Sequence, residues 1–323
     1  MIEELKYRLL TNGDEKYEDI NELLKNIPSP PWRDYKNGNK NISYVPTADG
    51  LELEVVKAAL ILRRPILVTG KPGIGKSALA KAIAKVLDLG KHLHWQITTQ
   101  STLKDALYSY DILGRLQDIQ LKKDDTNIST NIEKYLKLEP LGSAFVAKEK
   151  PKVLLIDELD KSDADLPNDL LHIFEEGYFE ISELKRLRTD TSIGIETVDG
   201  EKVDIRNGKV ECQIFPIIIM TSNGERDFSP AFMRRCLHIE LKAPSKDELI
   251  KIIKSNLNID ADSNDEKIIE FFIEKREESD DNIATDQLLN AIYLRANGIV
   301  SDSDLEELQT NPLMENIFKP LVE

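Results

Sequence analysis

The chain has 323 residues, enough to bury a substantial core and to divide into two domains. Its formal net charge of -15 argues against a surface built to attract nucleic acid or an anionic membrane. Residues 1–6 are too charged for a signal peptide, no run has the apolar length of a membrane span, and Cys212 and Cys236 form no CxxC motif. These features predict a cytoplasmic protein without a disulfide framework or a zinc site. The four histidines are interpreted as packing or surface residues.

The N-terminal region precedes the globular part. Residues 1–27 carry apolar residues at helical spacing and are predicted to form two short amphipathic helices. The proline-rich segment 28–33 is expected to be a stiff linker, because proline fixes φ and restricts the residue before it. The nucleotide domain is expected to begin near residue 44, with a helix over 53–62.

A phosphate-binding loop follows the strand-like run 65–69 at once, because the next eight residues fit the pattern GxxxxGK[ST]. The residues predicted to hold the nucleotide are Gly70, Lys71, Pro72, Gly73, Ile74, Gly75, Lys76, Ser77 and Ala78. The glycines let backbone N–H groups point at phosphate oxygens. Lys76 is expected to reach the β- and γ-phosphates, and the hydroxyl of Ser77 to bind Mg²⁺ at the start of a helix over 79–87. The alternative, a glycine-rich turn that binds nothing, is disfavoured by the strand and helix around it.

A second motif consists of the apolar run 153–156 followed by Asp157 and Glu158. Four apolar residues in a row are typical of a strand buried on both faces of a parallel sheet, and such sheets bind ligands at their carboxyl ends. Asp157 is predicted to hold Mg²⁺ and Glu158 to polarise the attacking water. Helix capping is the structural alternative for these acids. Their position favours hydrolysis of a γ-phosphate.

A third apolar strand, 217–220, leads to Asn223, which is predicted to orient the lytic water beside Glu158. Arg234 and Arg235 follow shortly afterwards. A solvated pair at a helix end is the default interpretation of two adjacent arginines. Their position behind Asn223 favours an arginine finger, which stabilises charge on the transferring phosphoryl group from a neighbouring subunit.

Two insertions interrupt the alternation of strands and helices. The first is residues 101–117, where Tyr108, Tyr110 and Arg115 are candidates for contact with a partner or substrate, although such aromatic residues are at least as often core. The second lies within 192–215. It alternates apolar and polar residues and contains two hairpin signals, Asp199-Gly200 and Asn207-Gly208.

The pattern from residue 245 onward is wholly helical. Capping boxes at 245–248 and 263–266 are predicted to open two helices, and a third helix is predicted over 285–294. The role of residues 301–323 is not readable from the sequence.

The order GKPGIGKS (70–77), LLIDELDKS (154–162), TSNGERDFSPAFMRRC (221–236) resembles an AAA+ ATPase of the MoxR-like branch. Segments 107–115, 165–171 and 174–181 resemble the subgroup found beside von Willebrand A-domain proteins in bacterial conflict-system operons. The resemblance covers about residues 44–257.

The resemblance implies an α/β fold: a P-loop NTPase with a parallel sheet flanked by helices, a helix-2 insertion, a presensor-1 type β-hairpin, and a small C-terminal all-α lid. The implied domains are an N-terminal helical segment with its linker (1–43), the AAA+ domain (44–243), the lid (244–300) and a C-terminal extension (301–323). Family members often carry a lid arginine that touches the γ-phosphate. Residues 284–287 contain none, which leaves Arg234, Arg235 and, as a further candidate, Arg226 to face the phosphates.

The resemblance also implies an activity and partners. It predicts an Mg²⁺-dependent ATPase that forms a homo-oligomer, a hexameric ring, and remodels a protein partner in the manner of a chaperone, with a von Willebrand A-domain protein as the candidate partner. Two alternatives remain open at this point. One is a nucleotide-dependent switch that recruits an effector, which the absent lid arginine favours. The other is a nucleic-acid motor, which the net charge disfavours.

Overall fold

The computed structural model divides the chain into two compact units. One is Pro46–Lys242, and the other combines Met1–Val45 with Ala243–Glu323. The described residues are 29–33, 43–47, 50–121, 132–187, 192–279, 282–301, 305–306 and 308–320. The two helices predicted over 1–27 lie outside them. No helix in these ranges is both long enough and apolar enough to span a membrane.

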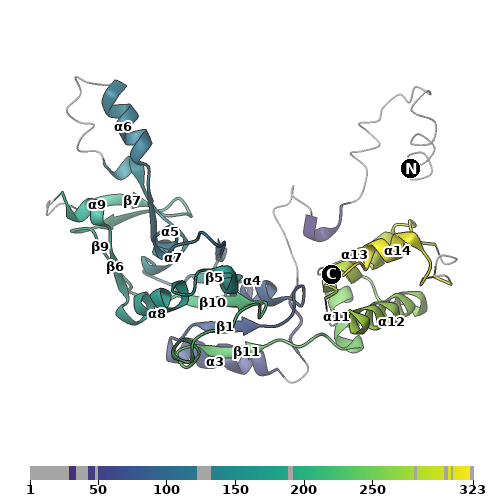
Figure 1. The fold of residues 1–323 in the computed structure, drawn as a ribbon. Helices are drawn as coiled ribbons and strands as arrows, with labels where there is room; N and C mark the ends of the chain where they lie inside the picture. Colours follow the sequence, from purple (N-terminus) through teal and green to yellow (C-terminus); the bar gives the residue numbers. More distant parts are fainter. Residues whose placement is uncertain are drawn as a thin grey trace, which may run out of the picture. The chain divides into compact units, whose positions relative to one another are not determined.

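The first unit is built on a five-stranded parallel sheet with the order β11-β1-β10-β5-β2 (Figure 1). Its strands are β1 (Ile66–Thr69), β2 (Leu93–Gln96), β5 (Val153–Asp157), β10 (Ile217–Ser222) and β11 (Leu237–Glu240). The central strands β5 and β10 are apolar runs because helices cover both faces of a sheet of this kind. The α/β fold with a parallel sheet flanked by helices is therefore confirmed.

The flanking helices include α3 (Leu51–Leu62), α4 (Lys76–Val86), α7 (Pro140–Phe145), α8 (Leu166–Glu176) and α10 (Pro230–Met233). Helix α3 packs on β1 and β11, α4 on β5 and β10, and α7 on β2 and β5. The helix predicted over 79–87 begins earlier, at Lys76. The reason is the preceding Gly75, whose left-handed φ of 100° lets the chain turn directly from the loop into the helix.

The first insertion forms part of a second sheet, of order β3-β4-β7-β8. The insertion, 101–117, contains α5 (Leu103–Leu107), β3 (Tyr108–Tyr110) and the start of α6 (Ile112–Leu121). It is followed by η2 (Ile132–Tyr135) and β4 (Leu136–Leu138), and β4 pairs with β3. Helix α6 extends away from both sheets in Figure 1. Tyr108 is buried and stacks on Phe179, so it is a core residue. Arg115 donates to the hydroxyl of Tyr110 at 2.6 Å, and this bond anchors α6.

The second insertion contains one hairpin where the sequence suggests two. Strands β7 (Ile193–Glu196) and β8 (Lys202–Ile205) pair antiparallel around Gly200, as predicted. After the turn at Asn207-Gly208, β9 (Lys209–Glu211) pairs with β6 (Tyr178–Glu180), the strand that precedes α9 (Ser182–Lys185). Its link to the segment after β8 is a single bridge between Arg206 and Lys209. The physical reason is burial, because this pairing sets Val210 opposite the buried Phe179.

The second unit is helical. Its helices are α11 (Lys246–Leu257), α12 (Ser263–Glu278), α13 (Thr285–Ala296) and α14 (Pro312–Ile317), with a short turn η1 (Pro31–Arg33). Their core includes Phe272, Met314 and Phe318, and Trp32 packs edge-on against Tyr293 with ring centroids 6.0 Å apart. These contacts give the linker tryptophan and the C-terminal segment a packing role.

Of the two predicted capping boxes, one lies where it is predicted and the other begins one residue earlier. Ser245 caps α11 and Glu248 completes its box. The cap of α12 is Asp262 with Asp265, one residue earlier than the predicted box at 263–266. Asp262 is favoured because its side chain accepts from two backbone N–H groups, those of Asn264 and Asp265, and also pairs with an arginine.

Candidate nucleotide-binding site

The phosphate loop joins the carboxyl end of β1 to the first turn of α4. Three of its residues have positive φ: Gly70 at 146°, Gly73 at 75° and Gly75 at 100°. A Cβ on Gly70 would stand 2.6 Å from the carbonyl oxygen of Leu241, so the loop leaves no room for a side chain there. The loop is thus a cradle of backbone groups at the amino end of a helix, which suits an anion.

Lys76 lies inside this loop and is only 7% exposed. Its Nζ donates to the carbonyl oxygens of Gly70 and Lys71, at 2.7 and 2.8 Å. Burial lowers the pKa of Lys76 to about 8, against the opposing effect of the nearby carboxylates, led by Asp160. A phosphate bound in the loop would stabilise the charged form of this amine.

Asp157 receives hydrogen bonds from two hydroxyl groups. The Oγ of Ser77 lies 2.8 Å from Asp157 Oδ1, and the Oγ1 of Thr221 lies 2.5 Å from the same oxygen. On the other oxygen, His94 Nε2 lies at 3.4 Å. Burial alone would raise the pKa of Asp157, but hydrogen bonds from His94, Thr221 and Ser77 outweigh it and lower the pKa to about 2.

This pair of oxygen donors fits Mg²⁺. The ion prefers oxygen ligands, keeps several waters, and takes one or two protein carboxylates or hydroxyls together with substrate phosphates. Asp157 and Ser77 supply an ionised carboxylate and a hydroxyl from different elements at hydrogen-bond distance, next to the phosphate loop.

Glu158 has a left-handed backbone, with φ 60° and ψ 49°. Its N–H donates to Thr221 Oγ1 at 2.9 Å. Its Oε2 accepts from Gln96 Nε2 at 2.6 Å and from Lys161 Nζ at 2.9 Å. The carboxylate is therefore held by a residue at the end of β2 and by a residue of η3 (Leu159–Lys161).

Asn223 directly follows β10, so the structure brings it to the same edge of the sheet as Asp157 and Glu158. Its backbone N–H donates to Asp160 Oδ2 at 2.8 Å. Arg226, three residues on, is turned to protein carbonyls: its guanidinium donates to Ser162 O at 2.7 Å and to Asp163 O at 3.2 Å.

The two adjacent arginines do not join this cluster. They lie between α10 and β11, and β11 runs parallel to β1 with Leu237 opposite Ile66. Arg234 and Arg235 therefore stand before the amino end of β11, whereas the phosphate loop follows the carboxyl end of β1. Arg235 forms an ion pair with Glu175 of α8. Within the described ranges, the side chain of Arg234 makes no hydrogen bond or ion pair.

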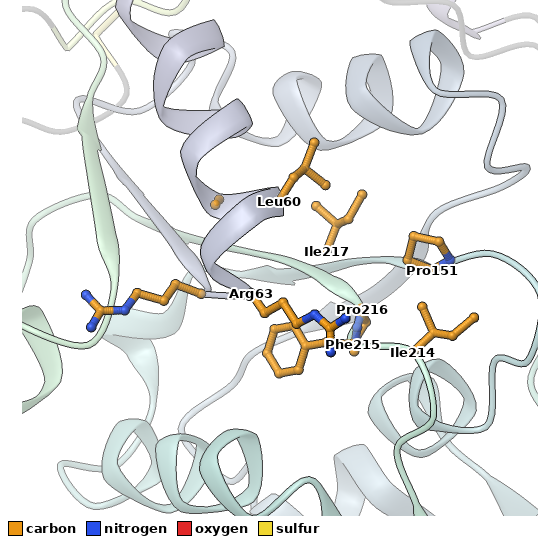
Figure 2. A pocket seen from close by; sticks show the side chains of 9 residues that line it. Leu60, Arg63, Pro151, Ile214, Phe215, Pro216 and Ile217 are labelled. Atoms are coloured by element: carbon orange, nitrogen blue, oxygen red, sulfur yellow. The ribbon is translucent and has the colours of Figure 1, made fainter.

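A separate cavity of about 150 Å³ lies at the amino-terminal ends of β1 and β10 (Figure 2). It is lined by apolar side chains such as Leu60, Phe215 and Ile217, with Arg63 and Arg64 beside them. Because it lies at the amino-terminal ends of β1 and β10, it is distinct from the phosphate loop, which follows the carboxyl end of β1.

Several residues of the site escape sequence reasoning. Thr221 and Gln96 had a signal, because both stand at the carboxyl ends of strands where polar groups gather. His94 was assigned to packing or the surface, yet it contacts Asp157. No sequence pattern singles out Asp160, because it is one of several acids in its motif. Its role depends on the loop that carries Asn223 and Glu225, which is distant in the sequence.

The parallel sheet, the glycine loop on the amino end of α4, and the acids on the neighbouring strand define a P-loop nucleotide-binding domain. The family model for the AAA domain (dynein-related subfamily) matches residues 65–236, more than half of the 323 residues. The chain therefore belongs to this AAA family.

Among curated proteins, the chain is similar to the chaperone protein ClpB of Chlamydia muridarum (strain MoPn / Nigg) and of Chlamydia trachomatis serovar D. Each is 23% identical over 207 residues, which is 61% of this chain. The match spans 22% of the length of these relatives.

Two solved structures are also similar. Domain III of the Thermotoga maritima replication initiation protein DnaA is 17% identical, with a TM-score of 0.41, over 85% of this chain and 95% of that one. NtrX from Brucella abortus is 15% identical, with a TM-score of 0.44, over 80% of this chain and 53% of that one.

Proposed function

We propose that the chain is an Mg²⁺-dependent ATPase. The observation that carries this proposal is the placement of Ser77 Oγ 2.8 Å from Asp157 Oδ1, beside a buried Lys76 and next to a second acid, Glu158. A phosphate loop alone needs only the lysine and the backbone. The ionised Asp157 and the adjacent Glu158 add what hydrolysis needs.

Each residue has a role in the proposed reaction. The loop N–H groups and Lys76 bind the β- and γ-phosphates, and Ser77 and Asp157 hold Mg²⁺. The ion, when bound, neutralises charge that develops on the phosphate oxygens. Glu158 accepts a hydrogen bond from the attacking water and polarises it, and Asn223 orients that water.

We also propose that the sites are shared between copies. A parallel strand rises about 3.3 Å per residue, so the three steps from Leu237 to Glu240 separate the two ends of β11 by roughly 10 Å. Arg234 and Arg235 therefore lie too far from the phosphate loop of their own chain, but a neighbouring copy can bring its pair to that loop. The exposed Arg235–Glu175 ion pair does not prevent this, because such pairs contribute roughly 0–1 kcal/mol.

The output proposed for ATP turnover is remodelling of a protein partner by a hexameric, MoxR-like, chaperone-like assembly, with a von Willebrand A-domain protein as the partner to test first. The residue pattern of the three motifs and the similarity to ClpB over 61% of the chain support this direction. The projecting helix α6 and the β7–β8 hairpin are the elements proposed to meet the partner.

One observation favours a second candidate, a nucleotide-controlled switch with slow turnover. The carboxylate of Glu158 is engaged by both Gln96 and Lys161, so it is not free to act on water until those bonds rearrange.

The test compares wild type with Glu158→Gln and Lys76→Ala. We expect Glu158→Gln to bind ATP with wild-type affinity and to lose turnover, because the amide keeps the shape but cannot polarise water. Lys76→Ala should lose binding itself. Phosphate release and titration of a fluorescent ATP analogue measure the two properties. Retained turnover in Glu158→Gln rejects the role of Glu158, and ATP binding without turnover in wild type selects the switch.

A further inference from the structure

Two chain segments lie against each other just beyond the last residues at which β5 and β10 pair with each other. One is the turn 158–163, which carries Glu158, and the other is the segment 221–226, which comprises the last two residues of β10 and the loop that carries Asn223. The last paired residues of the two strands are Ile156 and Met220. Beyond that pair the sheet no longer sets the separation of the segments, so side chains must do so.

The side chains of three residues, Thr221, Asp160 and Arg226, join the segments by hydrogen bonds. Thr221 Oγ1 accepts the N–H of Glu158 at 2.9 Å, and the guanidinium of Arg226 donates to the carbonyls of Ser162 and Asp163. Between these two contacts lies Asp160, whose Oδ2 accepts the N–H of Asn223 at 2.8 Å and that of Glu225 at 3.2 Å. Asp160 thus binds the backbone on both sides of Gly224, at the centre of the junction.

Asp160 is buried, with an exposed fraction of 6%. Its second oxygen, Oδ1, is also buried and has no hydrogen-bond partner within the described part of the chain. A buried carboxylate with one unsatisfied oxygen carries a cost of desolvation. The two N–H groups that Oδ2 accepts, those of Asn223 and Glu225, offset this cost, and both belong to the loop that carries Asn223.

We propose that Asp160 is a positioning residue, which ties the loop bearing Asn223 to the turn bearing Glu158 and so keeps the two groups in register for attack on the γ-phosphate. The inference rests on the proposed ATPase function and deepens it. Among the described residues, the carboxylate of Asp160 makes no hydrogen bond to the phosphate loop or to Arg234 and Arg235; its two hydrogen bonds go to the N–H groups of Asn223 and Glu225. It acts through the backbone of the residue that orients the water.

Asp160 also carries a charge near Lys76, and a positioning role can be distinguished from an effect of that charge by two substitutions. A single oxygen accepts both N–H groups, so an asparagine can reproduce both bonds with its carbonyl oxygen while it removes the charge. If hydrogen bonding is what matters, Asp160→Asn retains most of the turnover and Asp160→Ala does not. If the charge matters, both variants lose turnover to the same extent.

The experiment measures kcat, KM and the affinity for a non-hydrolysable ATP analogue in Asp160→Ala, Asp160→Asn and Asp163→Asn. Asp163 is the matched control, because it is an exposed acid of the same turn that contributes only its carbonyl oxygen. We expect Asp160→Ala to lower kcat on the order of tenfold or more with affinity unchanged, since small misplacements of reacting groups are costly. Asp160→Asn and the control should stay within about threefold of wild type. Equal kcat in Asp160→Ala and wild type overturns the proposal, as does equal loss in the Ala and Asn variants.

A second measurement does not depend on turnover. Hydrogen exchange at the amides of Asn223 and Glu225 should be protected in wild type and Asp163→Asn and should accelerate in Asp160→Ala. If wild type hydrolyses no ATP, the proposed function has failed, and the exchange data still decide whether Asp160 holds the loop. Unchanged protection in a folded Asp160→Ala protein rejects the tie itself.

Discussion

Thr221 connects both acids of the site through one hydroxyl. It accepts the N–H of Glu158 and donates to Asp157 Oδ1, and the residue is only 1% exposed. Glu158 also has a left-handed backbone, which costs a non-glycine residue roughly 1–3 kcal/mol and is found at functional sites. The hydroxyl therefore holds an acid in a conformation that it would not adopt alone.

Thr221→Val should lower the free energy of unfolding by roughly 1–3 kcal/mol, because it leaves buried polar groups without a partner. It should also reduce turnover more than tenfold, because Glu158 and Asp157 both lose an anchor. Thr221→Ser keeps the hydroxyl and serves as the control, with turnover near wild type. Urea unfolding and phosphate release check the two effects, and a fully active valine variant would contradict the assignment.

Lys76 gives the site a pH dependence with a definite sign. Its pKa in the free protein is about 8, since burial disfavours the charged amine. Below pH 8 the amine is charged and ready for phosphate. Above pH 8 it is neutral in the free protein and must take up a proton when ATP binds. The affinity for ATP should therefore fall as the pH rises from 8 toward 10.

Calorimetric titrations at pH 9 in buffers with different ionisation enthalpies measure that proton directly. Up to one proton per nucleotide should be taken up at pH 9, and almost none at pH 7. Uptake that is equal at both values would show that the lysine is already charged in the free site.

The sequence predicts the residues of the site better than their partners. The loop and the acid pair are contiguous in the chain, so their pattern is visible without a fold. Thr221 and Asp160 lie more than sixty residues apart along the chain from the groups they bind. Their roles follow from the register of β5 with β10, which no local pattern determines.

At the scale of elements, two adjacent residues, Asp262 and Ser263, are candidates for the N-cap of α12, and the structure assigns the cap to Asp262. Asp262→Ala should cost roughly 0.5–2 kcal/mol, because it removes the acceptor for two helix N–H groups and the ion pair with Arg295. Ser263→Ala should be nearly neutral, since Ser263 is already the first residue of the helix. Urea unfolding followed by circular dichroism compares the two, and the reverse order would restore the cap predicted from sequence.

The elements themselves were largely predictable, and their pairing less so. Strands β5 and β10 and the cap of α11 follow from runs and motifs that act over a few residues. The partner of β9 does not, because the Asn207-Gly208 turn sets the direction of the chain but not which edge it meets. Burial of Val210 beside Phe179 is a tertiary effect that outweighs the local hairpin signal.

At the scale of the whole molecule, the proposed shared site predicts assembly driven by nucleotide. Glu158→Gln should keep ATP bound, so its mass by light scattering should rise from that of a monomer to that of a closed ring when Mg-ATP is added. Lys76→Ala is the control and should remain a monomer. A Glu158→Gln protein that binds ATP and never assembles would favour the switch, or an assembly that requires its partner.

The placement of Arg234 and Arg235 before the amino end of β11 also has a kinetic consequence. If every competent site needs a cation from another copy, dilution removes activity without unfolding a single molecule. The rate then grows more steeply than the first power of protein concentration until assembly is complete. Each chain would hold an intact pocket for ATP and still be silent by itself, so that the cell could regulate turnover through local abundance alone.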